Sequence, residues 1–215
     1  MGNVGVALLD ALVLRLLFPA AGVAWAVACD ARGWGVFNQA TIPAWSGIVV
    51  SIAALDFITY AQHWLLHRIP LLWRMHLTHH TDQEIDFTTG LRFHPLEAVY
   101  TTSVRLAIIA LLGLPPLGVL VAEIASLVVS FWEHANVRVP LALDRALRLL
   151  IVTPEVHRTH HSQDGRDNQS NAAARNPRTI TSLPRSDGRP AAAPCYRGAV
   201  PSLAPMASPM ARSSS

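Results

Sequence analysis

The chain has 215 residues, of which 51% are apolar and 14% charged. Its net charge is +3, and all of its strongly basic residues are arginines. A soluble domain carries about 25% charged residues, so this deficit and the positive mean hydropathy of +0.31 favour a protein partly solvated by lipid. No basic run alternates with aromatic residues, which argues against a nucleic-acid-binding surface. Cys29 and Cys195 lie far apart in unlike contexts and indicate neither a disulfide framework nor a CxxC site.

The first predicted element is an apolar stretch over residues 4–29, VGVALLDALVLRLLFPAAGVAWAVAC, which Asp10 and Arg15 interrupt. Its length suits a membrane-spanning helix, which needs about 20 residues. A cleaved signal peptide is the alternative, but the apolar run is long and no basic residue precedes it. We therefore predict an N-terminal membrane helix and loop over residues 1–44.

A second apolar segment, residues 42–61, continues into His63 without a breaker, so the first histidines are expected to extend the end of this helix. Asp56 lies about two turns before His63. A carboxylate within a membrane helix is costly and more often functional than not.

Residues 98–133 are long enough for two further helices, and the turn signal GLPP at 113–116 divides them into a predicted hairpin. Arg105 and Glu123 interrupt its arms. They either pair across the hairpin or, in the case of Arg105, reach the lipid interface by snorkelling.

Residues 141–151, LALDRALRLLI, alternate apolar and charged residues at helical spacing, which predicts an amphipathic helix at the membrane surface. Arginines are concentrated in the histidine-containing segments and after the hairpin, whereas the loop at 30–41 carries one and the turn at 113–116 carries none. By the positive-inside tendency, we expect the histidines to face the cytoplasm.

All ten histidines lie between His63 and His161, mostly in HWLLH (63–67), HLTHH (76–80) and HRTHH (157–161). This spacing places imidazoles on one face of a helix, and neutral imidazole is the commonest ligand of transition metals. One HxxxH often arises by chance, but three such clusters exceed what one tetrahedral site uses. We therefore predict that two metal ions share His63, His67, His76, His79, His80, His157, His160 and His161. His134 is favoured as a further ligand, whereas His94 is equally consistent with an interior, hydrogen-bonded histidine.

Four segments, in their order and spacing, resemble the fatty acid hydroxylase/sterol desaturase superfamily. They are HWLLHRIPLLWRMHLTHH, LRFHPLEAVY, FWEHANVRVPL and VTPEVHRTHHSQD. The resemblance covers roughly residues 45–171, our predicted catalytic domain. It implies an all-α integral-membrane bundle of about four membrane helices with a cytoplasmic histidine-rich cap. In that cap the clustered histidines and His134 would ligate two irons, for which zinc is a substitute.

The resemblance also implies the reaction, which is O2-dependent hydroxylation, or desaturation, of a lipid C–H bond. Ligating imidazoles donate their second N–H to acceptors, and Asp82, Glu84, Asp86 and Glu97 are candidates, although solvation at the surface is the simpler role for most of them. The sequence contains no GxGxxG, CxxC or haem-binding segment, so we expect a separate reductase or electron carrier.

Two other functions compete with this interpretation. A membrane protein that binds or transports metal would want ionisable ligands within its spanning segments, where only Asp56 and Glu123 are plausible. A zinc-dependent hydrolase would leave most histidines unexplained, and the sequence contains no HExxH.

The tail departs from the family pattern, which continues after HHS with an Asn-Tyr-Gly-like element and a Trp-Asp…Phe-Gly-Thr segment. Here residues 172–215 are rich in Ala, Arg, Pro and Ser, with no apolar period. We interpret them as disordered, or as an out-of-frame reading of a GC-rich gene, which the absence of lysine also favours. Translation of the other two frames beyond codon 171 tests the second interpretation.

Overall fold

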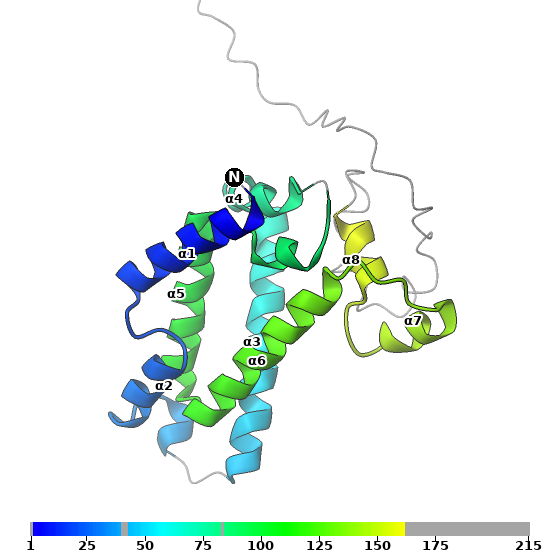
Figure 1. Cartoon of the computed structure of the whole chain (residues 1–215). Helices are drawn as coiled ribbons and strands as arrows, with labels where there is room; N and C mark the ends of the chain where they lie inside the picture. The colour runs from blue at the N-terminus through cyan, green and yellow to red at the C-terminus, as the bar shows by residue number, and fades with distance from the viewer. Residues whose placement is uncertain (1, 40–42, 83, 162–215) are drawn as a thin grey trace, which may run out of the picture.

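The computed structural model describes residues 2–39, 43–82 and 84–161, so the predictions for 172–215 lie outside the described residues. Within these ranges all regular structure is helical, as predicted. The elements are α1 (Asn3–Leu17), α2 (Val23–Asp30), η1 (Val36–Gln39), α3 (Ala44–Arg68), α4 (Pro70–His80), η2 (Phe87–Leu91), α5 (Pro95–Leu112), α6 (Pro116–Glu133), α7 (Leu141–Leu147) and α8 (Pro154–His160) (Figure 1).

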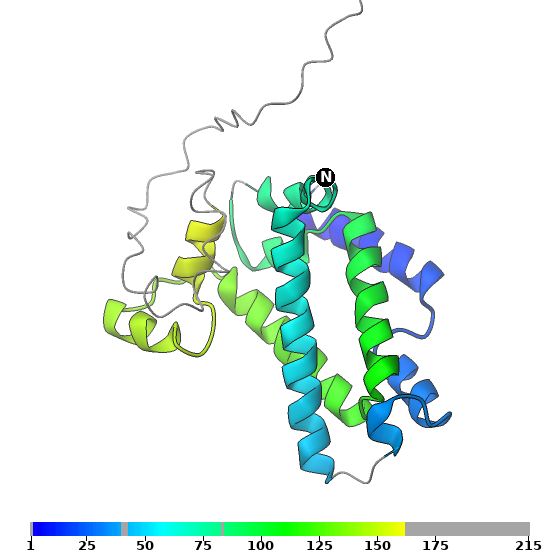
Figure 2. The same cartoon turned by 180° about the vertical axis from the view of Figure 1, so that it is seen from behind.

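Three helices, α3, α5 and α6, are long and apolar enough to cross a membrane. Figures 1 and 2 show α3 and α5 with nearly aligned axes and opposite chain directions, while α6 crosses them obliquely. The outer face of α6 exposes large apolar side chains, among them Ile124, Leu127 and Val128, as expected for a surface that contacts lipid rather than water. The prediction of an all-α integral-membrane bundle is confirmed.

The N-terminal apolar stretch forms two helices, so the prediction of one continuous helix over 4–29 is wrong. α1 ends at Leu17, and the chain resumes as α2 only after Gly22, whose φ is +60°. Pro19 lacks a backbone N–H and disfavours helical geometry at the preceding Phe18, and Arg15 Nη1 donates to the Pro19 carbonyl at 2.7 Å. The two pieces run from the histidine end of the bundle, where the N-terminus lies, toward the opposite end (Figure 1).

The predicted hairpin over 98–133 is confirmed as α5 and α6. α5 ends at Gly113, which has a left-handed conformation with φ +68°. A Cβ at this position would also lie 2.6 Å from the Trp34 carbonyl oxygen, so conformation and space both require glycine. Arg105 donates to Thr59 Oγ1 on α3 at 3.1 Å, and the described residues show no ion pair between Arg105 and Glu123 within 4 Å.

Close packing of α3 against α6 fixes the centre of the bundle. A Cβ on Gly118 of α6 would overlap Ser51 Oγ and lie 3.0 Å from the Gly47 carbonyl oxygen, both on α3. Gly47 and Ser51, like Gly118 and Ala122, are four residues apart, the small-xxx-small spacing that lets membrane helices approach closely. Leu55 and Val119 are fully buried in the adjoining apolar core.

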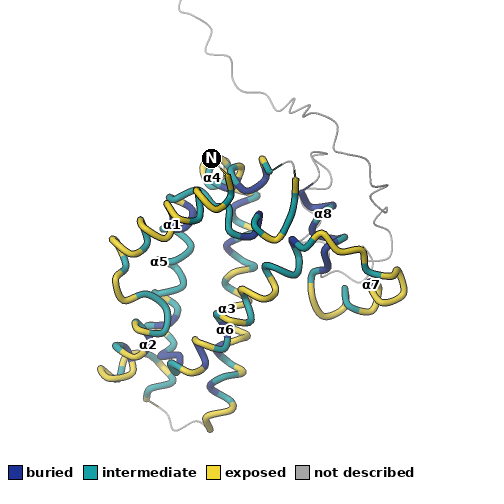
Figure 3. The backbone as a smooth tube through the Cα atoms, in the orientation of Figure 1, coloured by how far each residue is buried: buried dark blue, intermediate teal, exposed yellow. Residues whose placement is uncertain are grey.

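The amphipathic segment predicted over 141–151 is helical only over α7, which buries Asp144 in an ion pair of 2.6 Å with Arg148. Leu143, Leu149 and Leu150 are exposed, which agrees with a membrane-surface helix, although that placement stays a prediction. Figure 3 shows buried residues gathered where α4 and α8 meet the end of α3. The histidines occupy this end.

Candidate metal centre

The histidines come from four elements that converge at one end of the bundle. α3 supplies His63 and His67 from its last turns, and Pro70 then starts α4 after an extended Ile69. Because proline fits the first turn of a helix but cannot continue α3, the chain turns sharply at this point. His67 consequently lies 4.9 Å, between ring centroids, from both His76 and His80 of α4.

α6 and α8 complete the convergence. His134 caps the C-terminal end of α6, and α8 carries the second HxxHH cluster, whose three histidines are all buried. Almost a hundred residues separate His63 from His160, yet their Nε2 atoms lie 3.0 Å apart. The predicted meeting of the two clusters therefore occurs.

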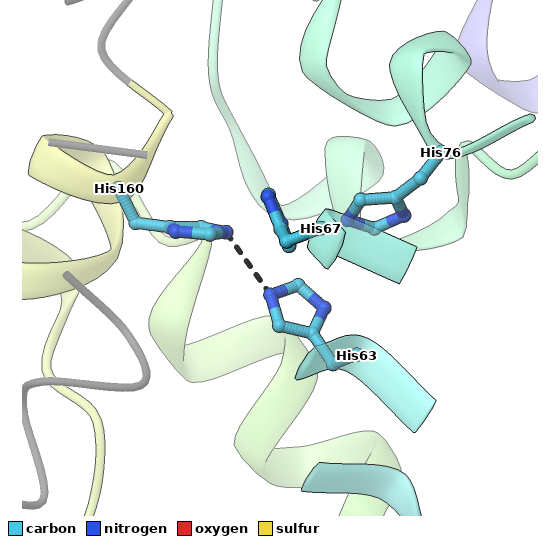
Figure 4. Close-up of side chains that lie close together, drawn as sticks. All are labelled: His63, His67, His76 and His160. Carbon is cyan, nitrogen blue, oxygen red and sulfur yellow. Dashed lines mark hydrogen bonds between the residues drawn. The ribbon is translucent and has the colours of Figure 1, made fainter. Parts of the chain in front are cut away.

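Eight of the nine predicted ligands fall into two groups, in each of which one nitrogen from every ring lies within 4.8 Å of the others. The first group consists of His63, His67, His76 and His160 (Figure 4). The second group consists of His79, His134, His157 and His161. Figure 4 shows the rings of the first group pointing toward a common centre from three elements.

Hydrogen bonding shows that the second group is suited to a cation. The Nδ1 atoms of His134 and His79 lie 2.7 Å from the Ser130 carbonyl and 3.2 Å from the Arg92 carbonyl. A carbonyl only accepts, so each Nδ1 must carry the proton, and each neutral ring then has a lone pair on Nε2. These two Nε2 atoms lie 3.2 Å apart. Two lone pairs at this distance repel one another unless a positive ion lies between them.

The first group is arranged in the same way. His76 Nδ1 lies 2.7 Å from Glu97 Oε1, with both side chains buried. The Nε2 atom of His76 therefore carries the lone pair that can bind a metal. The Nε2 atoms of His76 and His67 are buried and have no hydrogen-bond partner among the described residues. A buried lone pair without a partner is costly, and coordination of a metal would satisfy it. The donor set therefore fits two nitrogen-ligated metal ions.

Burial also sets the protonation state that coordination requires. It keeps the pKa of His76, His79, His157 and His161 well below the ordinary value of 6.5, and the neighbouring histidines lower it further. These rings are therefore neutral at pH 7. Metal binding to them need not displace a proton.

His80 and His94 differ from the other predicted residues. His80 belongs to neither group, but it stacks on His161 at a centroid distance of 4.4 Å and has a buried Nε2 without a hydrogen-bond partner among the described residues. His94 is the N-cap of α5, where its Nδ1 accepts from the Leu96 N–H at 3.1 Å. That His80 and the eight grouped histidines bind metal stays a prediction.

Of the four acceptors suggested from the sequence, the structure places Glu97 on a grouped histidine. Asp82 accepts instead from Asn3 and Thr89, at 2.7 and 2.6 Å, and Asp86 caps η2. Glu84 is exposed. The surface solvation expected for most of these residues thus holds for Glu84, whereas Asp82 and Asp86 make local structural hydrogen bonds.

Sequence reasoning missed three groups that lie against the histidines. Two are the backbone carbonyls of Arg92 and Ser130, which no residue pattern indicates. The third is Glu133, whose Oε2 lies 4.0 Å from His157 Nδ1. Its position directly before His134, at the end of a helix that leads into the cluster, was an available signal.

A cavity of about 590 Å³ adjoins the histidines and extends between α3, α5 and α6. Histidines of both groups line it, including His63, His79 and His157. Small residues, Ala98 on α5 and Ala125 on α6, leave part of its space open. The volume is in the range of small-molecule sites, and the cavity gives a bound molecule direct access to the grouped histidines.

The contact between His76 and Glu97 predicts a measurable effect on metal binding. Glu97→Ala removes the acceptor that holds the His76 tautomer, and loss of such a contact typically costs about 10–100-fold in metal affinity. Glu97→Gln should cost less, because its amide oxygen can still accept the Nδ1 proton. Chelator competition on purified protein measures both, and equal affinity of Glu97→Ala and the unaltered chain would contradict the assigned role.

Comparison with known proteins identifies the family. The sequence model of the fatty acid hydroxylase family matches residues 48–174, more than half of the chain. The chain is 32% identical over 110 residues to alkylglycerol monooxygenase of Homo sapiens, an alignment that covers 51% of this chain and 24% of that protein. It is 27% identical over 117 residues to the ornithine lipid hydroxylase OlsE of Rhizobium tropici, covering 54% of this chain and 34% of that protein.

The chain thus spans about a quarter to a third of the length of the curated relatives it matches. No solved structure matches it. The family match falls on the segment that contains every histidine of the two groups. The chain belongs to the fatty acid hydroxylase family.

Proposed function

We propose that this chain is an O2-dependent lipid C–H hydroxylase, with residues 45–171 as its catalytic domain. Two iron ions would be held by His63, His67, His76, His79, His80, His134, His157, His160 and His161. The observation that carries the proposal is the pair of adjoining imidazole groups with inward lone pairs at the inner end of a cavity within a membrane bundle. The relatives, a monooxygenase and a hydroxylase whose names specify lipids, support the same reaction class.

The iron pair, when bound, would supply the activation of dioxygen. In the net reaction one oxygen atom enters a C–H bond and the other is reduced to water, which consumes two electrons and two protons. A desaturase at the same site would instead remove two hydrogens and release two waters. Both variants need a separate electron-donor protein, which meets the histidine end of the bundle on the cytoplasmic side of the membrane.

The residues of the chain have distinct parts in this proposal. The eight grouped imidazoles and His80 would hold the ions, and Glu97 and the carbonyls of Arg92 and Ser130 fix the tautomers of His76, His79 and His134. The cavity admits the lipid from the bilayer and excludes water. Both groups lie at one end of the bundle rather than along its length, which favours an oxygenase over a metal transporter.

Metal analysis and isotope labelling of detergent-purified protein test the proposal. We expect about two irons per chain and, with a chemical reductant, O2 uptake coupled to lipid oxidation. Under ¹⁸O2 a hydroxylase product carries one ¹⁸O atom, whereas a desaturated product carries none. Zinc-loaded protein is the control and should consume no O2. Metal flux into vesicles without O2 uptake would instead establish the transport alternative.

A further inference from the structure

The side chain of Asn3, in the first turn of α1, uses all of its polar atoms in contacts at the histidine end of the bundle. Its Nδ2 donates to Asp82 Oδ2 at 2.7 Å and to Thr88 Oγ1 at 3.0 Å. Its Oδ1 accepts from Arg92 Nη1 at 2.9 Å. A carboxylate only accepts and a guanidinium only donates, so these partners fix the orientation of the carboxamide. The position requires a side chain that donates and accepts at once.

Arg92 connects Asn3 to a histidine of the second group. Its Nε donates to the Thr78 carbonyl of α4 at 2.8 Å, and its own backbone carbonyl lies 3.2 Å from His79 Nδ1. The guanidinium is therefore held between α1 and α4, while the main chain of the same residue fixes the tautomer of His79. One residue thus joins the start of α1 to a ring that is proposed to bind metal.

The residues on either side of Arg92 contact the second group at two further points. The Phe93 ring is nearly parallel to the His79 ring, with centroids 5.2 Å apart. Gly90 lies so close to the end of α6 that a Cβ would be 3.1 Å from His134 Nδ1. Residues 87–93, which we call the η2 segment, therefore form one side of the second group.

The η2 segment is short and depends on contacts from other elements. η2 is a 3₁₀-helix of five residues, and the hydrogen bonds of such helices have poorer geometry than those of an α-helix. Thr89, which is fully buried, donates to Asp82 Oδ2 at 2.6 Å, and the same oxygen accepts from Asn3. The contacts of Asn3 with Asp82, Thr88 and Arg92 thus hold the segment at several points. Loss of Asn3 would release the side of the site that His79 and His134 share.

We infer that Asn3 is a positioning residue for the second metal site. It holds the η2 segment, and with it the Arg92 carbonyl and the Phe93 ring, against His79. His76 of the first group takes its orienting contact from Glu97 of α5 instead, so the influence of Asn3 is specific to the second group. The inference rests on the proposed function in one respect, which is that both histidine groups bind metal ions.

Cobalt(II) binding to variants with one complete histidine group tests this specificity without turnover. His160→Ala leaves the second group complete, and His161→Ala leaves the first. The visible absorption of cobalt(II) bound to imidazoles, followed in titrations of the purified full-length protein, measures the affinity of each. Asn3→Asp keeps the size of the side chain but places a second carboxylate against Asp82. We expect it to weaken cobalt(II) binding about tenfold in the His160→Ala background, the lower end of the range for residues that orient a ligand. Affinity in the His161→Ala background should not change.

A second substitution and a matched control make the result specific. Asp82→Asn should restore most of the affinity that Asn3→Asp loses, because donor and acceptor are then exchanged between the two positions. Asn38→Asp is the control, since it alters in the same way an amide that donates to the Trp34 carbonyl at 2.6 Å. Asn38 lies beside Gly113, at the C-terminal end of α5. The control should leave cobalt(II) affinity unchanged in both backgrounds.

The outcomes separate the inference from the proposed function. Equal weakening of both sites by Asn3→Asp, or weakening of neither, would overturn the inference. If Asn3→Asp does not fold, Asn3→Ala replaces it, because it removes the three hydrogen bonds without adding a charge and should also weaken the second site alone. Selective weakening in a protein that takes up no O2 with lipid and reductant would overturn the proposed function and leave the inference standing.

Discussion

His160→Ala is expected to lower the iron content of the purified protein from about two ions per chain to about one, and to reduce lipid turnover more than 100-fold. His160 provides one of four nitrogens in the first group and is 1% exposed, so solvent cannot easily replace it as a ligand. Loss of a residue that only orients a ligand costs about 10–100-fold, and loss of the ligand itself should exceed this. Elemental analysis and product quantification measure the two effects.

The next residue makes the experiment more specific. His161 belongs to the second group, so His161→Ala should also leave about one ion per chain, and the double variant should bind almost none. His94→Asn is the control, because asparagine is a good N-cap and His94 belongs to neither group. Retention of two irons by His160→Ala would contradict the division of the histidines into two sites.

This division shows where sequence reasoning reached its limit. Helical spacing indicated that the histidines of one cluster share a face, and the structure brings both ends of the core together. Spacing does not indicate that the consecutive residues His160 and His161 serve different groups. That depends on how α8 is rotated against α3 and α4, which long-range packing determines. The orienting carbonyls of Arg92 and Ser130 are equally invisible in a sequence, since every residue has one.

The break between α1 and α2, by contrast, could have been predicted from the sequence. Pro19 and Gly22 both lie within the stretch that we predicted as one helix. Proline is tolerated inside membrane helices when neighbouring groups satisfy the freed backbone, so a proline alone does not end such a helix. The combination with a glycine three residues later, which has a positive φ, is what ends the helix.

The cavity depends on residues whose importance no motif shows. Ala98 and Ala125 are unremarkable in a membrane helix, and only their positions beside the histidine groups make them significant. Asp56 was predicted to be functional because carboxylates are rare at membrane depth. The structure places it in the cavity wall, and its functional role stays a prediction.

Filling the cavity should separate metal binding from lipid oxidation. Ala125→Phe adds a benzyl side chain to the wall of α6 that faces the cavity, in the space that an alkyl chain would occupy. Overpacking costs about 1–3 kcal/mol, and where the bound lipid bears this cost kcat/KM falls by roughly 5–150-fold. Iron content should stay near two ions per chain, because Ala125 lies about two and a half turns before His134, the nearest histidine along α6.

Leu127→Phe provides the matched control, since Leu127 is on the same helix but 48% exposed on its outer face. It should alter neither iron content nor turnover, because lipid accommodates a larger apolar side chain at little cost. Steady-state kinetics with a reductant, beside elemental analysis, distinguishes the two variants. If Ala125→Phe oxidised lipid at the normal rate, the substrate would reach the metal ions by a route other than the space between α3, α5 and α6. If Ala125→Phe lost iron as well, a change in the cavity wall would itself disturb the metal centre. The 100-fold effect expected for His160→Ala could then arise from altered packing rather than from the loss of a metal ligand.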